Sequence, residues 1–126
     1  MHLVALALAL SLSASQAAVV RDAAAHYSGM PVEIVVERGV PGSYLRFARR
    51  LETTLRSAGL TVTLSRGATI GADCPHREGI RVAYTPERSG PATRIAESFQ
   101  RSRVVSGSVP SCSLPGEGVL RFLIAS

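Results

Sequence analysis

Four short runs of aliphatic and β-branched residues alternate with two amphipathic stretches, and this order constrains the fold more than any other feature of the chain. Proline or glycine precedes each short run, as is typical of strands, and the runs cover residues 32–36, 60–64, 80–84 and 119–124. The two longer stretches repeat apolar residues three and four positions apart, which is the period of a helix with one buried face. They cover residues 43–58 and 92–99. The sequence therefore predicts the order strand, helix, strand, strand, helix, strand.

This order is that of the split βαβ arrangement, an α+β fold. We expect a four-stranded antiparallel sheet with both helices on one face. Because crossover connections are right-handed, the first two strands should be parallel, with the third antiparallel between them. The fourth strand should then lie on the other side of the first.

The N-terminus has the features of an export signal. An uncharged, apolar run from Leu3 to about Leu12 is followed by Ser15-Gln16-Ala17, a small-x-small sequence of the kind that signal peptidases cut. The run is too short to cross a bilayer, which takes about 20 apolar residues. The predicted organisation is a signal peptide at 1–17, a linker at 18–30 and one small domain at 31–126, with no stable membrane span after cleavage.

Charge narrows the classes of partner. The 126 residues include 14 basic side chains, all of them arginine, against 9 acidic ones, for a net charge of +5. Such a balance permits binding to polyanions such as wall polymers, anionic lipid or nucleic acid. Nucleic-acid recognition on a split βαβ sheet needs exposed aromatic residues for base stacking. The first strand has none and the third has only Tyr84, so we expect no nucleic-acid partner.

The two cysteines, Cys74 and Cys112, both follow the export signal, and an isolated pair in an oxidising compartment is typical of a structural disulfide. The expected topology brings both to the same end of the sheet. Two alternatives stay open. Cys74 with the nearby His76 is a candidate thiolate–imidazolium nucleophile, and both cysteines with His76 and either His26 or Asp73 could hold zinc. We expect the disulfide, with no metal, no cofactor and no catalytic residue.

Several segments resemble a known family. The sequence PVEIVVERGVPG at residues 31–42 leads to a helix ending in LRSAGLTV, and IRVAYTPE at residues 80–87 precedes GPATRIA. From Pro31 to Ile124 the chain resembles the C-terminal domain of LytR-type (LytR/CpsA/Psr) cell-envelope proteins, which is similar in architecture to the peptidoglycan-binding SPOR domain. The resemblance implies an accessory envelope domain that has no catalytic residue of its own.

Two surfaces are candidate binding sites. The first is the open face of the sheet, where Glu33, Arg81 and Arg121 form a mixed-charge surface. The second is the basic side of the first helix, with Arg46, Arg49 and Arg50 at helical spacing. A solvated helix face explains the second equally well, because Arg49 or Arg56 can pair with Glu52 at a spacing of three or four residues.

The sequence thus predicts a non-catalytic, exported binding or scaffolding domain of the bacterial cell envelope, periplasmic or secreted. Its partner is expected to be peptidoglycan, an anionic wall polymer or an envelope protein. The alternative is a small wall-active hydrolase or thiol-redox protein that uses Cys74 and His76.

Overall fold

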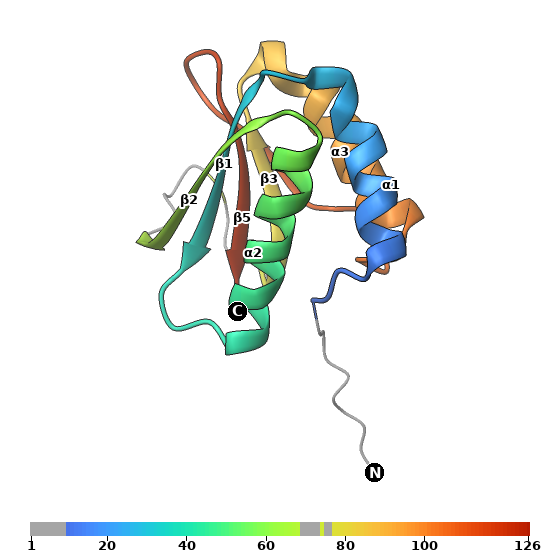
Figure 1. The fold of residues 1–126 in the computed structure, drawn as a ribbon. Helices are drawn as coiled ribbons and strands as arrows, with labels where there is room; N and C mark the ends of the chain where they lie inside the picture. The colour runs from blue at the N-terminus through green and yellow to red at the C-terminus, as the bar shows by residue number, and fades with distance from the viewer. Residues whose placement is uncertain (1–9, 69–73, 75–76) are drawn as a thin grey trace.

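The structure is a computed structural model that describes residues 10–68, 74 and 77–126. Within these ranges it forms one sheet with helices on one side (Figure 1). None of the helices in the described ranges is long and apolar enough to cross a membrane.

The secondary structure follows the predicted order with two additions, α1 and β4. The strands are β1 (Pro31–Glu37), β2 (Thr61–Ala68), β3 (Gly79–Tyr84), β4 (Ser111–Ser113) and β5 (Leu120–Ala125). The helices are α1 (Ala14–Ala24), α2 (Gly42–Ser57) and α3 (Ser89–Arg101), with short 3-10 turns η2 (Ala25–Tyr27) and η3 (Pro86–Arg88). The α+β class is confirmed at this level.

The strand order differs from the predicted one and is β2-β1-β5-β3-β4. β1 pairs in parallel with both β2 and β5, β3 pairs antiparallel with β5, and β4 pairs in parallel with β3. The predicted four-stranded antiparallel sheet is therefore wrong. The described residues form five strands of mixed direction. In addition, β2 and β3 are not a hairpin, because β1 and β5 lie between them (Figure 1).

The observed order follows from two βαβ units and one central strand. The units β1-α2-β2 and β3-α3-β4 each join neighbouring parallel strands through a helix, the kind of crossover that parallel neighbours need. β5 lies between the two units. Its side chains are buried on both faces, with Phe122 and Ile124 on one and Leu123 and Ala125 on the other. A strand that is apolar on both faces is most stable in the middle of a sheet, which places β5 between β1 and β3.

The core lies between the sheet and the layer of α2 and α3. Alternate residues of β1 point into it, so Val32, Ile34 and Val36 are buried while the residues between them are partly exposed. The helices contribute larger side chains: Phe47, Leu51 and Leu55 from α2, and Ile95 and Phe99 from α3. The Phe99 ring meets the Phe122 ring edge-on, with 5.7 Å between the ring centroids.

The segment predicted to be a linker is part of the fold. α1 packs against α2 and α3, and Val20 and Ala24 are fully buried in the common core. The helix begins in a capping box between Ser13 and Gln16. The side-chain Nε2 of Gln16 also donates to Ser102 O at 3.1 Å. The linker prediction for residues 18–30 is therefore wrong, and the folded unit extends N-terminal to Pro31. α1 escaped prediction because alanines give it little contrast between its buried and exposed sides.

The signal peptide stays a prediction. Its apolar run lies mostly in residues 1–9, outside the described residues, and its expected end at Ala17 falls in the first turn of α1.

Candidate functional site

Three arginines form an exposed row on α2, and we call Arg46, Arg49 and Arg50 the α2 basic face. Spacings of three and four positions put them on one side of the helix. The other side buries Phe47 and Leu51, so packing of the core turns the arginines toward solvent. No ion pair joins any of the three to another described residue.

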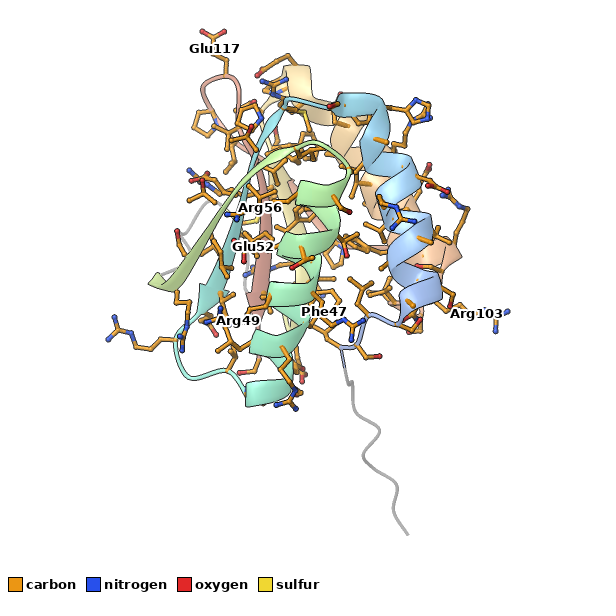
Figure 2. All side chains as sticks on the ribbon, viewed as in Figure 1. Phe47, Arg49, Glu52, Arg56, Arg103 and Glu117 are labelled. Atoms are coloured by element: carbon orange, nitrogen blue, oxygen red, sulfur yellow. A yellow bond between two sulfur atoms is a disulfide. The ribbon has the colours of Figure 1, made fainter. Side chains whose placement is uncertain are left out.

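Glu52 neutralises only the next arginine along the helix. Its Oε2 lies 2.9 Å from Arg56 Nη2, an i, i+4 ion pair. Figure 2 shows Arg49, Glu52 and Arg56 one above another along α2. Of the two pairings that the sequence allowed for Glu52, the structure contains the one with Arg56, and Arg49 keeps its charge exposed.

A cavity of about 460 Å³ lies at the carboxyl ends of β1 and β2, where α2 begins. Arg38 and Arg66 are among its lining residues, and Arg38 Nη2 donates to Gly67 O at 3.2 Å. The first turn of α2 carries no acidic residue and no side-chain cap, so the positive end of the helix dipole adds to these charges. We call this the strand-end cavity. Glu37 also lines it, so its lining carries two guanidinium groups against one carboxylate, a balance that favours an anionic group.

Sequence reasoning missed Arg38 and Arg66, although a signal was present. Each follows closely on one of the first two predicted strands, and those strands were expected to be parallel. The carboxyl ends of parallel strands in one sheet lie at the same edge. Parallel pairing therefore predicts that the two guanidinium groups lie near each other, beside the start of the connecting helix.

The sheet-face candidates do not form an open charged surface. Glu33 and Arg121 occupy paired positions on β1 and β5, and Arg121 Nε donates to Glu33 Oε1 at 2.6 Å. Both side chains are partly exposed, at 43% and 39% respectively, but each neutralises the other. A ligand would have to break this pair before it could use either charge.

Arg81 lies on the same face but is inaccessible, with only 2% of its surface exposed. Its Nη1 donates to Cys74 O at 3.3 Å. Burial lowers the pKa of Arg81, while the negative charge of Glu37 acts in the opposite direction. In this structure Arg81 is thus not presented to solvent, and its guanidinium is part of the packing around Cys74.

The predicted disulfide between Cys74 and Cys112 is confirmed, with 5.6 Å between the two Cα atoms. Cys112 lies on β4 opposite Ala83, and Cys74 packs against Ala83 and Leu123 on the sheet face away from the helices. The pairing was predicted from an isolated pair of cysteines behind an export signal, and the topology that was given in its support proved wrong. In the structure, β4 brings Cys112 to this position. With both sulfurs in the bridge, neither is a thiolate for nucleophilic attack or for zinc.

The remaining partners of the cysteine hypotheses are not gathered in the described structure. His76 and Asp73 lie outside the described residues, and His26 is exposed on η2. Among the residues that are described, no group of three or more histidine, cysteine or acidic side chains is placed to hold a metal ion.

The comparisons with known proteins do not assign the chain to a family. No protein-family model matches the sequence, and no curated protein or solved structure gives a significant match. The resemblance to the LytR C-terminal domain therefore stays a prediction from the residues that carry it.

Proposed function

We propose that this chain is an exported, non-catalytic binding domain of the bacterial cell envelope, which holds an anionic wall polymer against the α2 basic face. The observation that carries the proposal is the exposure of Arg46, Arg49 and Arg50 without an ion-pair partner among the described residues. The strand-end cavity beside them would seat one phosphate or carboxylate of the same polymer.

Charge and fold support this assignment. Guanidinium groups form paired hydrogen bonds to phosphate and carboxylate, and an arginine row on a rigid helix presents several of them at a fixed spacing. The disulfide is of the kind found in oxidising compartments, which agrees with export from the cytoplasm. The remaining charged candidates, Glu33 and Arg121, neutralise each other, and this leaves α2 as the better contact surface.

The test is co-sedimentation of the oxidised protein with purified cell-wall sacculi at low and at moderate salt. In the variant Arg49→Glu/Arg50→Glu we expect at least a tenfold loss of bound protein at both salt concentrations. The matched control is Arg94→Glu/Arg101→Glu, which changes the net charge equally but on exposed positions of α3.

Three outcomes separate the possibilities. Binding that survives moderate salt and is lost only in the α2 variant supports the proposal. Equal losses in the two variants would show that net charge alone drives pelleting, because exposed charges are screened over about 10 Å at 0.1 M salt. No pelleting of the unmodified protein would reject a wall polymer as the partner.

A further inference from the structure

The two edges of the sheet differ in length, and among the described residues no strand pairs with the outer side of the longer one. β4 forms one edge with three residues, whereas β2 forms the other with eight. Figure 1 shows β2 as the outermost strand of the sheet on one side, next to β1. An unpaired edge exposes backbone N–H and C=O groups to other chains, and proteins commonly protect such edges by shortness or by charged side chains. Shortness protects β4 but not β2.

The pairing register shows which backbone groups of β2 are exposed. The N–H of Thr61 donates to Met30 O at 3.0 Å, so Thr61 and every second residue after it direct their N–H and C=O groups toward β1. The N–H and C=O groups of Val62 and Leu64 therefore point away from the sheet. The register with β1 is regular along this stretch and shifts only after Val36.

One side chain obstructs part of this edge. Arg56 Nη2 donates to Val62 O at 2.9 Å, and the same nitrogen lies 2.9 Å from Glu52 Oε2. The Arg56 side chain is 57% exposed, so an incoming backbone N–H can take its place at Val62 O without opening the core. Within the described structure, no side chain hydrogen-bonds the outward groups of Leu64.

The charges beside the edge determine what can pair with it. Arg56 and the exposed Arg66 flank the stretch, and the nearby Glu52 already pairs with Arg56. A second copy of this chain, paired through its own β2, would bring the same arginines together, and like charges on paired strands destabilise a sheet. A segment with carboxylates on its helix-side face would instead pair with both guanidinium groups.

We propose that the outer edge of β2 binds an extended, acidic segment of a protein partner as an additional strand. The segment forms backbone hydrogen bonds to Val62 and Leu64, displaces Arg56 from Val62 O, and places its carboxylates beside Arg56 and Arg66. This mode of recognition requires peptide groups in the partner, so it differs from the polymer binding proposed for the α2 basic face.

The probe is an end-capped heptapeptide of alternating glutamate and valine, whose carboxylates all lie on one face when the peptide is extended. Binding is followed by amide hydrogen exchange and backbone NMR shifts of the full chain. We expect saturating peptide to slow exchange of the Leu64 amide several-fold, while the Thr61 and Thr63 amides, which face β1, change little.

Two control peptides separate pairing from charge. One has N-methyl groups on alternate amides, and the other has lysine in place of glutamate, and neither should protect Leu64.

A pair of variants tests the same edge from the protein side. Leu64→Pro removes the outward N–H without removing a bond to β1, and Leu64→Ala loses similar packing but keeps the N–H. The peptide should bind the alanine variant and fail to bind the proline variant, with circular dichroism checking that both are folded.

Equal binding of the N-methylated peptide, or binding of the acidic peptide that leaves Leu64 unprotected, would overturn the proposal, whatever the stability of the proline variant. Binding retained by Arg49→Glu/Arg50→Glu would show that the edge acts independently of the α2 basic face.

Discussion

At the scale of single residues, the position of a charge in the sheet decides whether it is available to a ligand. Glu33 and Arg121 are 88 residues apart in the chain, yet they occupy paired positions on adjacent strands and bond to each other. Among the described residues, Arg46, Arg49 and Arg50 of α2 have no such ion-pair partner. The sequence shows which charges exist, but pairing depends on strand register, which the alternation of apolar residues does not determine across non-adjacent segments. For this reason the sequence did not show that Glu33 and Arg121 pair with each other.

The carboxylate of Glu87 is expected to make stability depend on pH. It accepts hydrogen bonds from the Gly118 N–H and from Thr85 Oγ1, and these bonds lower the pKa of Glu87 below its ordinary value of 4.5. Because the pKa is lower in the folded state, the stabilisation is complete above about pH 4.5 and disappears as the pH falls through the folded pKa. Glu87→Gln should therefore lower Tm at pH 7, and its difference from the unmodified protein should shrink on acidification. Glu117→Gln, on the exposed loop tip labelled in Figure 2, is the control. A Glu87→Gln effect of the same size at pH 3 and pH 7 would contradict this assignment.

At the scale of elements, α1 shows that a helix without a marked apolar stripe can still be part of the core. Its buried positions are Val20, Ala23 and Ala24, and small side chains let it lie close to α2 and α3. Its start is defined by Ser13 and Gln16 rather than by hydrophobic periodicity. Cleavage after Ala17, where the export signal is predicted to end, would remove both capping residues.

The cap can be tested in the uncleaved chain. Ser13→Ala leaves the Gln16 N–H without its acceptor at the helix start, and loss of an N-cap costs about 1 kcal/mol. We expect Tm to fall by a few degrees. Ser11→Ala, an exposed serine just before the helix, is the matched control and should leave Tm unchanged. Identical melting of the two variants would show that the Ser13 cap contributes nothing to stability. A chain that starts at Ala18 should melt below the Ser13→Ala variant, because it also loses the buried Leu12.

At the scale of the whole molecule, the sequence predicted the elements better than their arrangement. The strand at 32–36 and the helix at 43–58 lie within one residue of β1 and α2 at all four ends, because their periodicity is strong. The sheet order was missed, since local pattern does not say which strands become neighbours. The signal that favoured the observed order was the run at 119–124, which is apolar at nearly every position and therefore suits the centre of a sheet. β4 is too short to leave a pattern.

The disulfide should stabilise this arrangement because it joins distant parts of the chain. The bridged residues are 38 positions apart, and closing a loop of that length contributes up to about 4 kcal/mol through the entropy of the unfolded chain. Cys112→Ser should therefore lower Tm by several degrees, and Ser113→Ala, exposed on the same strand, should not. Reducing agent should lower Tm of the unmodified protein and leave that of Cys112→Ser unchanged. An unaltered melting point in Cys112→Ser would contradict a structural role. A reactive free thiol in the native protein would instead favour the alternative hydrolase or thiol-redox function of Cys74 and His76.

The central place of β5 has a consequence for the order of events during biosynthesis. β5 follows every other described strand along the chain, yet within the sheet it is the strand that lies between the β1-α2-β2 unit and the β3-α3-β4 unit. The sheet therefore cannot be completed until residues 120–125 have been translated, and the β1–β5 pairing must close a loop of more than 80 residues, as the partners Glu33 and Arg121 show. Before β5 has been translated, the nascent chain is thus expected to lack a complete sheet and to stay incompletely folded. That is the physical state in which a polypeptide can pass through a narrow translocation channel.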